Sequence, residues 1–242
     1  MTDPSPPAVL TVGSLFSGIG GLDLGLERAG MEIIWHSEID PYACRVLAKH
    51  WPSVPNLGDI TTIDWTDVER PELLCGGFPC QDISIAGSGA GLEGEHSGLW
   101  AEFARAVREL RPRYVLVENS PALPVRGLGA VLADLAVLGY DAEWDCLPAA
   151  SVGAPHLRAR TWLLAYPAGF RDGMEEEPLL AGWPCPVDGG WWASEPGLVR
   201  VADGLPARVD RLRTLGNAVV PQVAEVIGRR IMLAAGVDEV AA

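Results

Sequence analysis

The chain lacks the features that mark membrane and secreted proteins. None of its apolar runs approaches the ~18 residues that a membrane-spanning helix needs. Its first ten residues, MTDPSPPAVL, have neither the basic start nor the apolar middle of a signal peptide. We therefore expect a cytoplasmic protein with no membrane partner.

Paired cysteines are also missing. The five cysteines are scattered, and no two of them show the C-x-x-C spacing of zinc sites and redox dithiols, so we expect no metal site. Cys44 lies in a helical pattern and Cys75 at a strand end, where we expect both to be buried as small apolar side chains. Cys80, in the segment GGFPCQDIS, is different because it directly follows a proline and a glycine pair at the end of a buried strand.

Positive charge is scarce. The formal net charge is −14 and Lys49 is the only lysine, which by itself disfavours nucleic-acid binding. Residues 1–155 carry 9 basic and 21 acidic groups, whereas residues 156–230 carry 9 arginines and 9 acids. Arginine suits bidentate contacts with phosphates and bases, although the codons of a GC-rich genome explain the bias equally well. We expect a bacterial or phage origin.

Strand patterns alternate with helical ones along most of the 242 residues. This alternation predicts an α/β fold, a doubly wound and mostly parallel Rossmann-like sheet with helices on both faces. After Tyr166 the pattern gives way to a Pro-, Gly- and Trp-rich region, and a helix returns near Pro221. The strands are expected at 8–16, 31–37, 72–76, 113–119, 140–147 and 160–166, and the helices at 22–30, 41–50, 98–110, 129–139 and 221–235.

A glycine-rich loop, within LFSGIGGLDLG, joins the first strand to the first helix. A doubly wound sheet binds nucleotide-like ligands at this place, and the helix N-terminus favours a negative group. The dinucleotide fingerprint G-x-G-x-x-G fails, because Asp23 stands where its third glycine would be. A tight turn without a ligand is the alternative interpretation.

Two acids follow at strand or loop ends. Glu38 ends the second strand, where an acid suits hydrogen bonds to ribose hydroxyls, and Asp59 in GDI could accept a hydrogen bond from an adenine amino group. Either acid could instead cap a helix, as we expect of Asp40. With the glycine loop, they indicate an adenosine-containing cofactor without a pyrophosphate, and S-adenosylmethionine fits.

Segments from residue 12 to about 230 resemble those of the cytosine-5 DNA methyltransferases, in that family's order. They are LFSGIGGLDLGLERAG, the acid in HSEID, GDI, GGFPCQDIS, ENS, GAPHLRARTWLLA and LGNAVVPQVAE. The resemblance implies a Rossmann-like methyltransferase that moves a methyl group from S-adenosylmethionine to carbon 5 of a flipped-out cytosine in duplex DNA. It also implies three parts: a catalytic and cofactor-binding domain (1–166), a small target-recognition region (167–207), and a return segment with the C-terminal helix (208–242).

The same resemblance assigns the catalytic roles. The Cys80 thiolate would add to carbon 6 of cytosine, so that carbon 5 can attack the methyl group. Glu118 would hold ring nitrogen 3 and the exocyclic amine, with a pKa raised by burial at its strand end. Arg160 would lie near the base's carbonyl and the thiol, with Arg158 supporting it or contacting phosphate. The alternation of Arg158, Arg160 and Trp162 predicts that the three share one strand face.

Further site residues follow from the matching segments. The residues expected at the cofactor are Phe16, Ser17, Gly18, Gly20, Gly21, Glu38, Asp59, Ile60, Pro79, Leu99, Asn217 and Ala218. Those expected at the DNA are Gln81, Ser84, Ser88, Arg208, Arg211 and Arg213. The glycine-rich segment 81–98 is expected to close as a lid over flipped-out DNA, unless it is an ordinary loop.

The recognition region departs from the family pattern. It is short, and it contains the acidic run 175–177, which disfavours phosphate approach. Three alternatives therefore stay open. A partner completes the recognition of DNA, the chain methylates tRNA in place of DNA, or it is a non-catalytic module that binds DNA for a partner. We expect a monomer, and a cognate restriction endonuclease is a further candidate partner.

Overall fold

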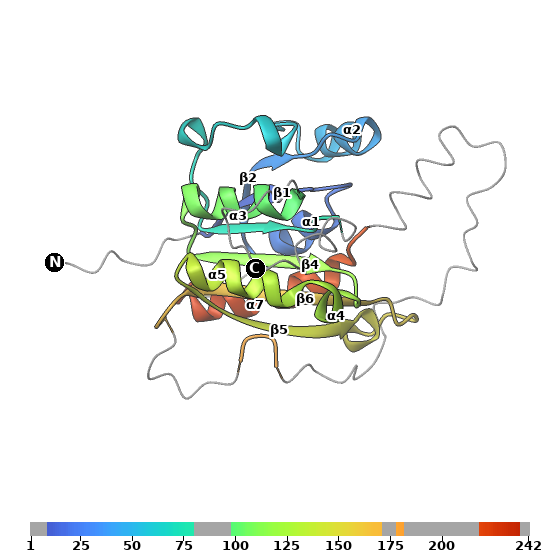
Figure 1. Cartoon of the computed structure of the whole chain (residues 1–242). Coiled ribbons are helices and arrows are strands. Elements are labelled where there is room, and N and C mark those ends of the chain that lie inside the picture. The colour runs from blue at the N-terminus through green and yellow to red at the C-terminus, as the bar shows by residue number, and fades with distance from the viewer. Residues whose placement is uncertain (1–8, 80–97, 171–177, 182–217, 238–242) are drawn as a thin grey trace.

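The structure, a computed structural model, describes residues 9–79, 98–170, 178–181 and 218–237. These residues form one mixed sheet with helices on both of its faces (Figure 1). Its six strands are β1 (Thr11–Leu15), β2 (Glu32–Ser37), β3 (Leu73–Gly76), β4 (Tyr114–Asn119), β5 (Tyr140–Pro148) and β6 (Ala159–Pro167).

The strands lie in the order β2-β1-β3-β4-β6-β5. The first four in this order are parallel to one another, whereas β6 is antiparallel to both of its neighbours. The carboxyl ends of the parallel strands therefore meet at one edge of the sheet, and β6 begins at that edge. The predicted doubly wound, mostly parallel α/β sheet is confirmed, and every expected strand overlaps an observed one.

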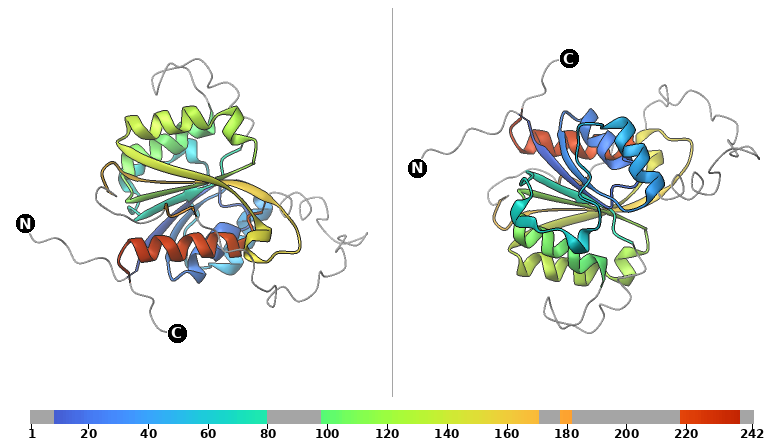
Figure 2. Two further views of the ribbon diagram at one scale, coloured as in Figure 1. Left: turned by 90° about the horizontal axis from the view of Figure 1, so that it is seen from below. Right: turned by 90° about the horizontal axis from the view of Figure 1, so that it is seen from above.

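Helices cover the sheet in two layers (Figure 2). On one face α1 and α7 share a core that includes Leu26 and Ile227, and on the other α3 and α5 share a core that includes Phe103 and Val131. The sequence pattern did not predict α4 or the 3₁₀ turns, which are too short to show a period. The helices are α1 (Gly21–Arg28), α2 (Pro41–His50), α3 (Leu99–Leu110), α4 (Leu123–Arg126), α5 (Leu128–Val137) and α7 (Pro221–Ala234), and the 3₁₀ turns are η1 (Ile60–Thr62), η2 (Trp65–Asp67) and η5 (Ala149–Val152).

Two glycines let the C-terminal segment lie directly on α1. A Cβ atom at Gly25 would lie 2.3 Å from the backbone oxygen of Pro221, and one at Gly21 would lie 2.6 Å from that of Val219. Residues four apart face the same side of a helix, so both glycines open one stripe of α1. The segment around Val219 and Pro221 therefore lies beside the first loop of the chain.

Replacing Gly25 with alanine is expected to lower the free energy of unfolding by about 1–3 kcal/mol, because the added methyl group overpacks against backbone that cannot rotate away. Gly129 in α5 is the matched control, since a Cβ atom there would meet nothing within 4 Å. Gly129→Ala should leave stability unchanged or raise it by up to about 1 kcal/mol. Chemical denaturation of the two variants measures the difference, and equal losses would contradict the packing argument.

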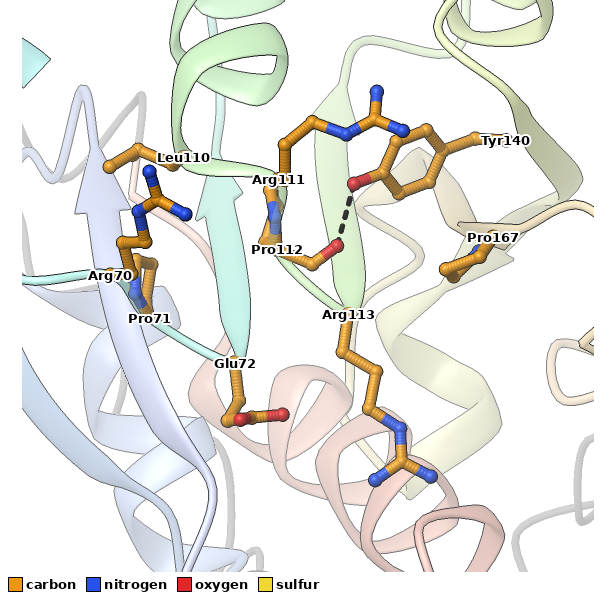
Figure 3. A pocket seen from close by; sticks show the side chains of 9 residues that line it. All are labelled: Arg70, Pro71, Glu72, Leu110, Arg111, Pro112, Arg113, Tyr140 and Pro167. Carbon is orange, nitrogen blue, oxygen red and sulfur yellow. Dashed lines mark hydrogen bonds between the residues drawn. The ribbon is translucent and has the colours of Figure 1, made fainter. Parts of the chain in front are cut away.

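A cavity of about 430 Å³ lies at the opposite edge of the sheet, where β3 and β4 begin (Figure 3). Two of its arginines contact the surrounding fold: Arg111 donates to the Leu138 carbonyl at 2.7 Å and lies over the Tyr140 ring, and Arg113 lies over the Phe170 ring. Their guanidinium groups point away from each other in Figure 3, so they stabilise this edge separately. The lining residues are Arg70, Pro71, Glu72, Leu110, Arg111, Pro112, Arg113, Tyr140 and Pro167.

A short piece of the expected recognition region is attached to the main sheet. The Glu143 carboxylate on β5 accepts hydrogen bonds from the N–H groups of Leu179 and Leu180, and Arg230 on α7 donates to the carbonyls of Leu179 and Ala181. The three-part division of the chain stays a prediction, because most of 167–217 lies outside the described residues. Within the described ranges, no helix is long and apolar enough to cross a membrane.

Candidate cofactor and base-binding site

The glycine loop after β1 has a backbone that few residues adopt. Gly18 and Gly20 have φ angles of 55° and 79°, in the left-handed region that glycine enters without strain. Phe16 has a φ of 53°, which is uncommon for a large side chain and typical of functional sites. A Cβ atom at Gly18 would meet nothing within 4 Å, so the loop faces open space at this position. The loop can thus receive a ligand close to its backbone.

Glu38 ties this loop to the end of β2. Its Oε2 accepts a hydrogen bond from the N–H of Gly18 at 2.7 Å, and its Oε1 accepts from the N–H groups of Ile39 and Asp40 at 2.8 and 2.7 Å. A carboxylate has about four acceptor positions and three are used here, so Glu38 can still accept a hydrogen bond from a ligand hydroxyl. Asp40 caps α2 by accepting from two backbone N–H groups, as expected.

Asn56 joins the two loops that carry the predicted cofactor acids, although no motif in the sequence marks it. Its Oδ1 accepts from the N–H of Glu38 at 3.0 Å and from that of Gly58 at 3.2 Å, while its Nδ2 donates to the Glu38 carbonyl at 3.0 Å. The same Nδ2 lies 3.3 Å from the sulfur of Cys44. The prediction that Cys44 is buried is wrong, because this residue is only partly buried. Its thiol donates to the Glu38 carbonyl oxygen at 3.2 Å.

Asp59 starts the 3₁₀ turn η1. Its Oδ1 accepts from the N–H and the hydroxyl of Thr61 at 2.9 and 2.8 Å, and these bonds lower the pKa of Asp59. The alternative interpretation of this acid as a cap is therefore confirmed. Asp64 caps η2 in the same way through Thr66. A cap of this kind holds the carboxylate ionised and in a fixed direction, which also suits an acceptor for a ligand.

Glu118, the second-last residue of β4, is buried and only 7% exposed. The Nε of Arg160 lies 3.0 Å from its Oε1, yet no hydrogen-bond donor among the described residues is aligned on that oxygen. Burial raises the pKa of Glu118 to about 7, although Arg160 and Arg158 act to lower it. A Cβ atom at Gly77 would lie 2.9 Å from Oε2, so this glycine makes room for the carboxylate. At neutral pH the carboxyl group of Glu118 is therefore partly protonated and partly ionised, and the permanently charged Arg160 lies beside it.

Asn119 connects this acid to the cysteine segment. Its side-chain amide donates to the Phe78 carbonyl at 2.9 Å in a buried hydrogen bond. Phe78 and Pro79 directly precede Cys80, so the chain enters the cysteine segment beside the end of β4. Cys80 itself lies outside the described residues, as do the other predicted residues Gln81, Ser84, Ser88, Arg208, Arg211, Arg213 and Asn217.

Arg158 does not share a strand face with Arg160 and Trp162, so that prediction is wrong. It precedes β6 and has a φ of 29°, which turns the chain before the strand alternation begins. Its guanidinium donates to the carbonyl of Ala218 instead. Arg158 therefore joins the acid site to the return segment near the glycine loop, a contact between residues far apart in the sequence.

The structure gathers most of the described candidates at the carboxyl edge of the parallel strands. Partly buried Phe16 and Leu99 pack on the same core, and Ile60 is buried in it. Ile39, which no motif in the sequence marks, is 68% exposed beside Glu38, where it offers an apolar surface. Among the described residues, no three His, Cys, Asp or Glu side chains are placed to hold a metal ion. The described candidates are Phe16, Ser17, Gly18, Gly20, Gly21, Glu38, Asp59, Ile60, Pro79, Leu99, Glu118, Arg158, Arg160 and Ala218.

The sheet order, the glycine loop and the acid after β2 define a Rossmann-like methyltransferase domain. A solved structure of a mutant of DNMT2 from Spodoptera frugiperda shares this fold, with a TM-score of 0.60 over 73% of this chain and 57% of that one at 18% identity. The chain belongs to the C-5 cytosine-specific DNA methylase family, whose model matches residues 10–178. The resemblance seen in the sequence is thereby confirmed.

Bacterial relatives agree with this assignment. The Type II methyltransferase M.Eco47II of Escherichia coli is 37% identical over 183 residues, 73% of this chain and 43% of the relative. M.HhaI of Haemophilus parahaemolyticus is 33% identical over 156 residues, 63% of this chain and 47% of the relative. The chain thus spans less than half the length of these two relatives.

Proposed function

We propose that this chain transfers a methyl group from S-adenosylmethionine to carbon 5 of a flipped-out cytosine in duplex DNA. The observation that carries the proposal is the buried Glu118 beside Arg160 at the carboxyl edge of the sheet. Its Oε1 pairs with Arg160, but no hydrogen-bond donor among the described residues is aligned on it, and a bound base would supply one, as buried polar atoms require. In its protonated form the carboxyl group can donate to ring nitrogen 3 while its second oxygen accepts from the exocyclic amine.

The chemistry follows from these groups. The sulfur of Cys80 adds to carbon 6, and the electron pair of the 5,6 double bond becomes available at carbon 5. Glu118 delivers its proton to ring nitrogen 3 and so limits the negative charge that builds up on the ring. Arg160, a permanent cation, stabilises the base's carbonyl. Once carbon 5 has used this electron pair to take up the methyl group, its proton passes to water, the Cys80 thiolate is expelled and the ring nitrogen 3 proton returns to Glu118, which restores the ring.

The side chains at the predicted cofactor site suit an adenosyl group, because they offer carboxylate acceptors for its polar groups and apolar surface for its base. S-adenosylmethionine, when bound, supplies an electrophilic methyl group. Glu38 would accept a hydrogen bond from a ribose hydroxyl, and Asp59 would accept one from the adenine amino group. Phe16, Ile39 and Leu99 would flank the adenine ring. The start of α1 would attract the amino acid's carboxylate. Pro79, Asn217 and Ala218 would border the methionine end.

Asp59→Ala is expected to weaken the affinity for S-adenosylhomocysteine about tenfold or more, because a hydrogen bond to a charged acceptor is lost. Asp64→Ala is the matched control, since it removes the same kind of cap from η2. Calorimetric titration compares the two, and thermal melting should show similar small losses of stability. Equal losses of affinity in both variants would show that Asp59 acts only as a cap.

Transfer of a labelled methyl group to duplex DNA by the purified chain tests the proposed function. Bisulfite sequencing of host DNA after expression would then give the methylated context. Methyl transfer to tRNA and to no duplex DNA would overturn the choice of substrate, and no transfer to either would overturn the proposal. We also propose DNA contacts through Gln81, Ser84, Ser88, Arg208, Arg211 and Arg213, a monomeric state, a cytoplasmic location and a cognate restriction endonuclease as partner.

A further inference from the structure

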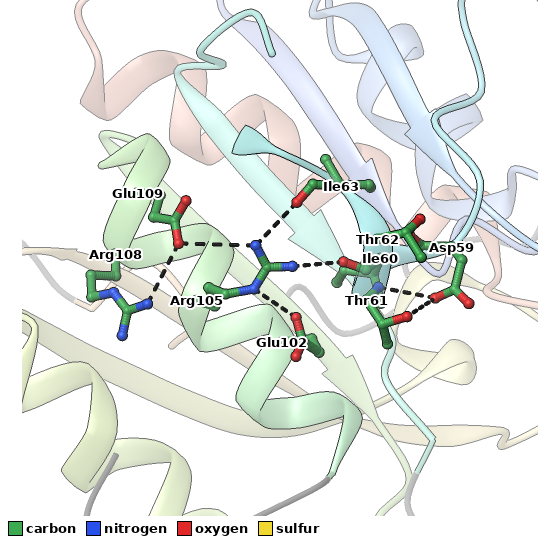
Figure 4. A network of polar contacts seen from close by, with 9 residues as sticks. All are labelled: Asp59, Ile60, Thr61, Thr62, Ile63, Glu102, Arg105, Arg108 and Glu109. Carbon is green, nitrogen blue, oxygen red and sulfur yellow. Dashed lines mark hydrogen bonds and ion pairs between the residues drawn. The ribbon is translucent and has the colours of Figure 1, made fainter. Parts of the chain in front are cut away.

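Arg105 on α3 holds the turn that begins with Asp59 (Figure 4). Its Nη2 donates to the Ile60 carbonyl at 2.8 Å and its Nη1 donates to the Ile63 carbonyl at 3.1 Å. Its Nε donates to the Glu102 carboxylate at 2.7 Å, which fixes the plane of the guanidinium. One side chain thus spans η1 from the start of the turn to the residue that follows it.

The turn has little stability of its own. A three-residue 3₁₀ helix makes few internal hydrogen bonds, and its last carbonyls need donors from elsewhere. Asp59 satisfies the N–H of Thr61 at the start of η1, and Arg105 satisfies carbonyl oxygens of the same segment. The planar fork of arginine sets the distance between two acceptors, which a single ammonium group cannot do.

We propose that Arg105 is a positioning residue that fixes Asp59 for recognition of the adenine amino group. This inference rests on the proposed function of the site. Arg105 acts through the backbone of η1, and α3 also contributes Leu99 at its first turn. The same helix thereby places Leu99 as an apolar contact for the base and, through Arg105, positions Asp59 as its hydrogen-bond acceptor.

A merely structural role of Arg105 makes a different prediction. Loss of a structural contact lowers stability and weakens every ligand alike. Loss of positioning weakens only ligands that bond to Asp59. A ligand with the inosine base distinguishes a positioning role of Arg105 from a structural one. This base carries a carbonyl group where adenine carries its amino group, and a carbonyl cannot donate a hydrogen bond to the Asp59 carboxylate.

Titration of the full chain with S-adenosylhomocysteine and with S-inosylhomocysteine tests the inference. Wild type is expected to prefer the adenosyl compound at least about tenfold. Arg105→Lys should weaken adenosyl binding about tenfold and change inosyl binding by less than about twofold, so that the preference is lost. Arg108→Lys is the matched control: Arg108 lies on the same helix, contacts Glu109 at 3.5 Å, and should keep the wild-type preference.

A second variant distinguishes the loss of positioning from misfolding. Glu102→Gln keeps the fork of Arg105 and weakens only the contact that orients it, so it should reduce the same preference partially. An Arg105→Lys or Glu102→Gln protein that is folded and keeps the wild-type preference overturns the inference, as does an equal weakening of both compounds. A wild-type chain that binds neither compound would instead overturn the proposed function, and with it this inference.

Discussion

Cys80→Ala is expected to reduce methyl transfer by at least about 1000-fold, because the variant has no sulfur to add to carbon 6 and activate carbon 5. Binding of DNA and of S-adenosylhomocysteine should stay close to wild type, since the thiol acts in the chemical step. Single-turnover transfer to duplex DNA measures the loss. The buried bond from Asn119 to the Phe78 carbonyl supports this choice of nucleophile, because it places the entry to the cysteine segment beside Glu118.

A trapping experiment identifies the nucleophile directly. With 5-fluorocytosine in duplex DNA, the fluorine at carbon 5 cannot leave as a proton does, so the sulfur–carbon bond persists after methyl transfer. Wild type should form an adduct that survives denaturing electrophoresis, and Cys80→Ala should form none. Cys146→Ala, which removes an exposed thiol on β5, should trap as well as wild type. An adduct on the Cys80→Ala protein would sink the proposed mechanism.

Glu118→Gln is expected to lower kcat/KM by about 10²- to 10⁴-fold. The amide can still pair with the cytosine edge, since it has both a donor and an acceptor, but it has no proton to deliver to ring nitrogen 3. DNA affinity should therefore change much less than turnover. Steady-state kinetics with duplex DNA, alongside a binding measurement, separates these two effects. A variant with wild-type turnover would show that proton delivery by Glu118 is unnecessary.

The pH dependence gives an independent check on Glu118. Its pKa is raised to about 7, so the carboxyl group is protonated below that pH and ionised above it. If the protonated form is required, kcat/KM should fall about tenfold per pH unit above about 7, because this parameter reports the free enzyme. Glu118→Gln should lack this limb of the profile. Glu225→Gln, a carboxylate on α7 that pairs with Arg229, should retain it.

Local patterns in the sequence were sufficient for the main elements. The alternation of apolar runs with amphipathic helices predicted the sheet, and the Asp40-Pro41 pair predicted the start of α2. The glycines of the segment after β1 predicted a loop there, and Gly18 and Gly20 do enter the left-handed region. These features depend on neighbours in the chain, so they can be found without knowing the tertiary contacts. The same holds for the motifs that carry the family resemblance.

The sequence by itself therefore determined the fold class, the family and the residue types of the site. Only the tertiary structure decided that Asn56 and Arg105 hold the loops of Glu38 and Asp59, and that Arg158 turns away from β6 toward Ala218. It also decided how far the pKa of Glu118 is raised, a rise that the strand-end position had predicted, because burial under other segments sets the cost of ionising a carboxyl group. Such contacts join positions tens of residues apart, and their energies depend on distance and solvent exclusion, which no local pattern contains.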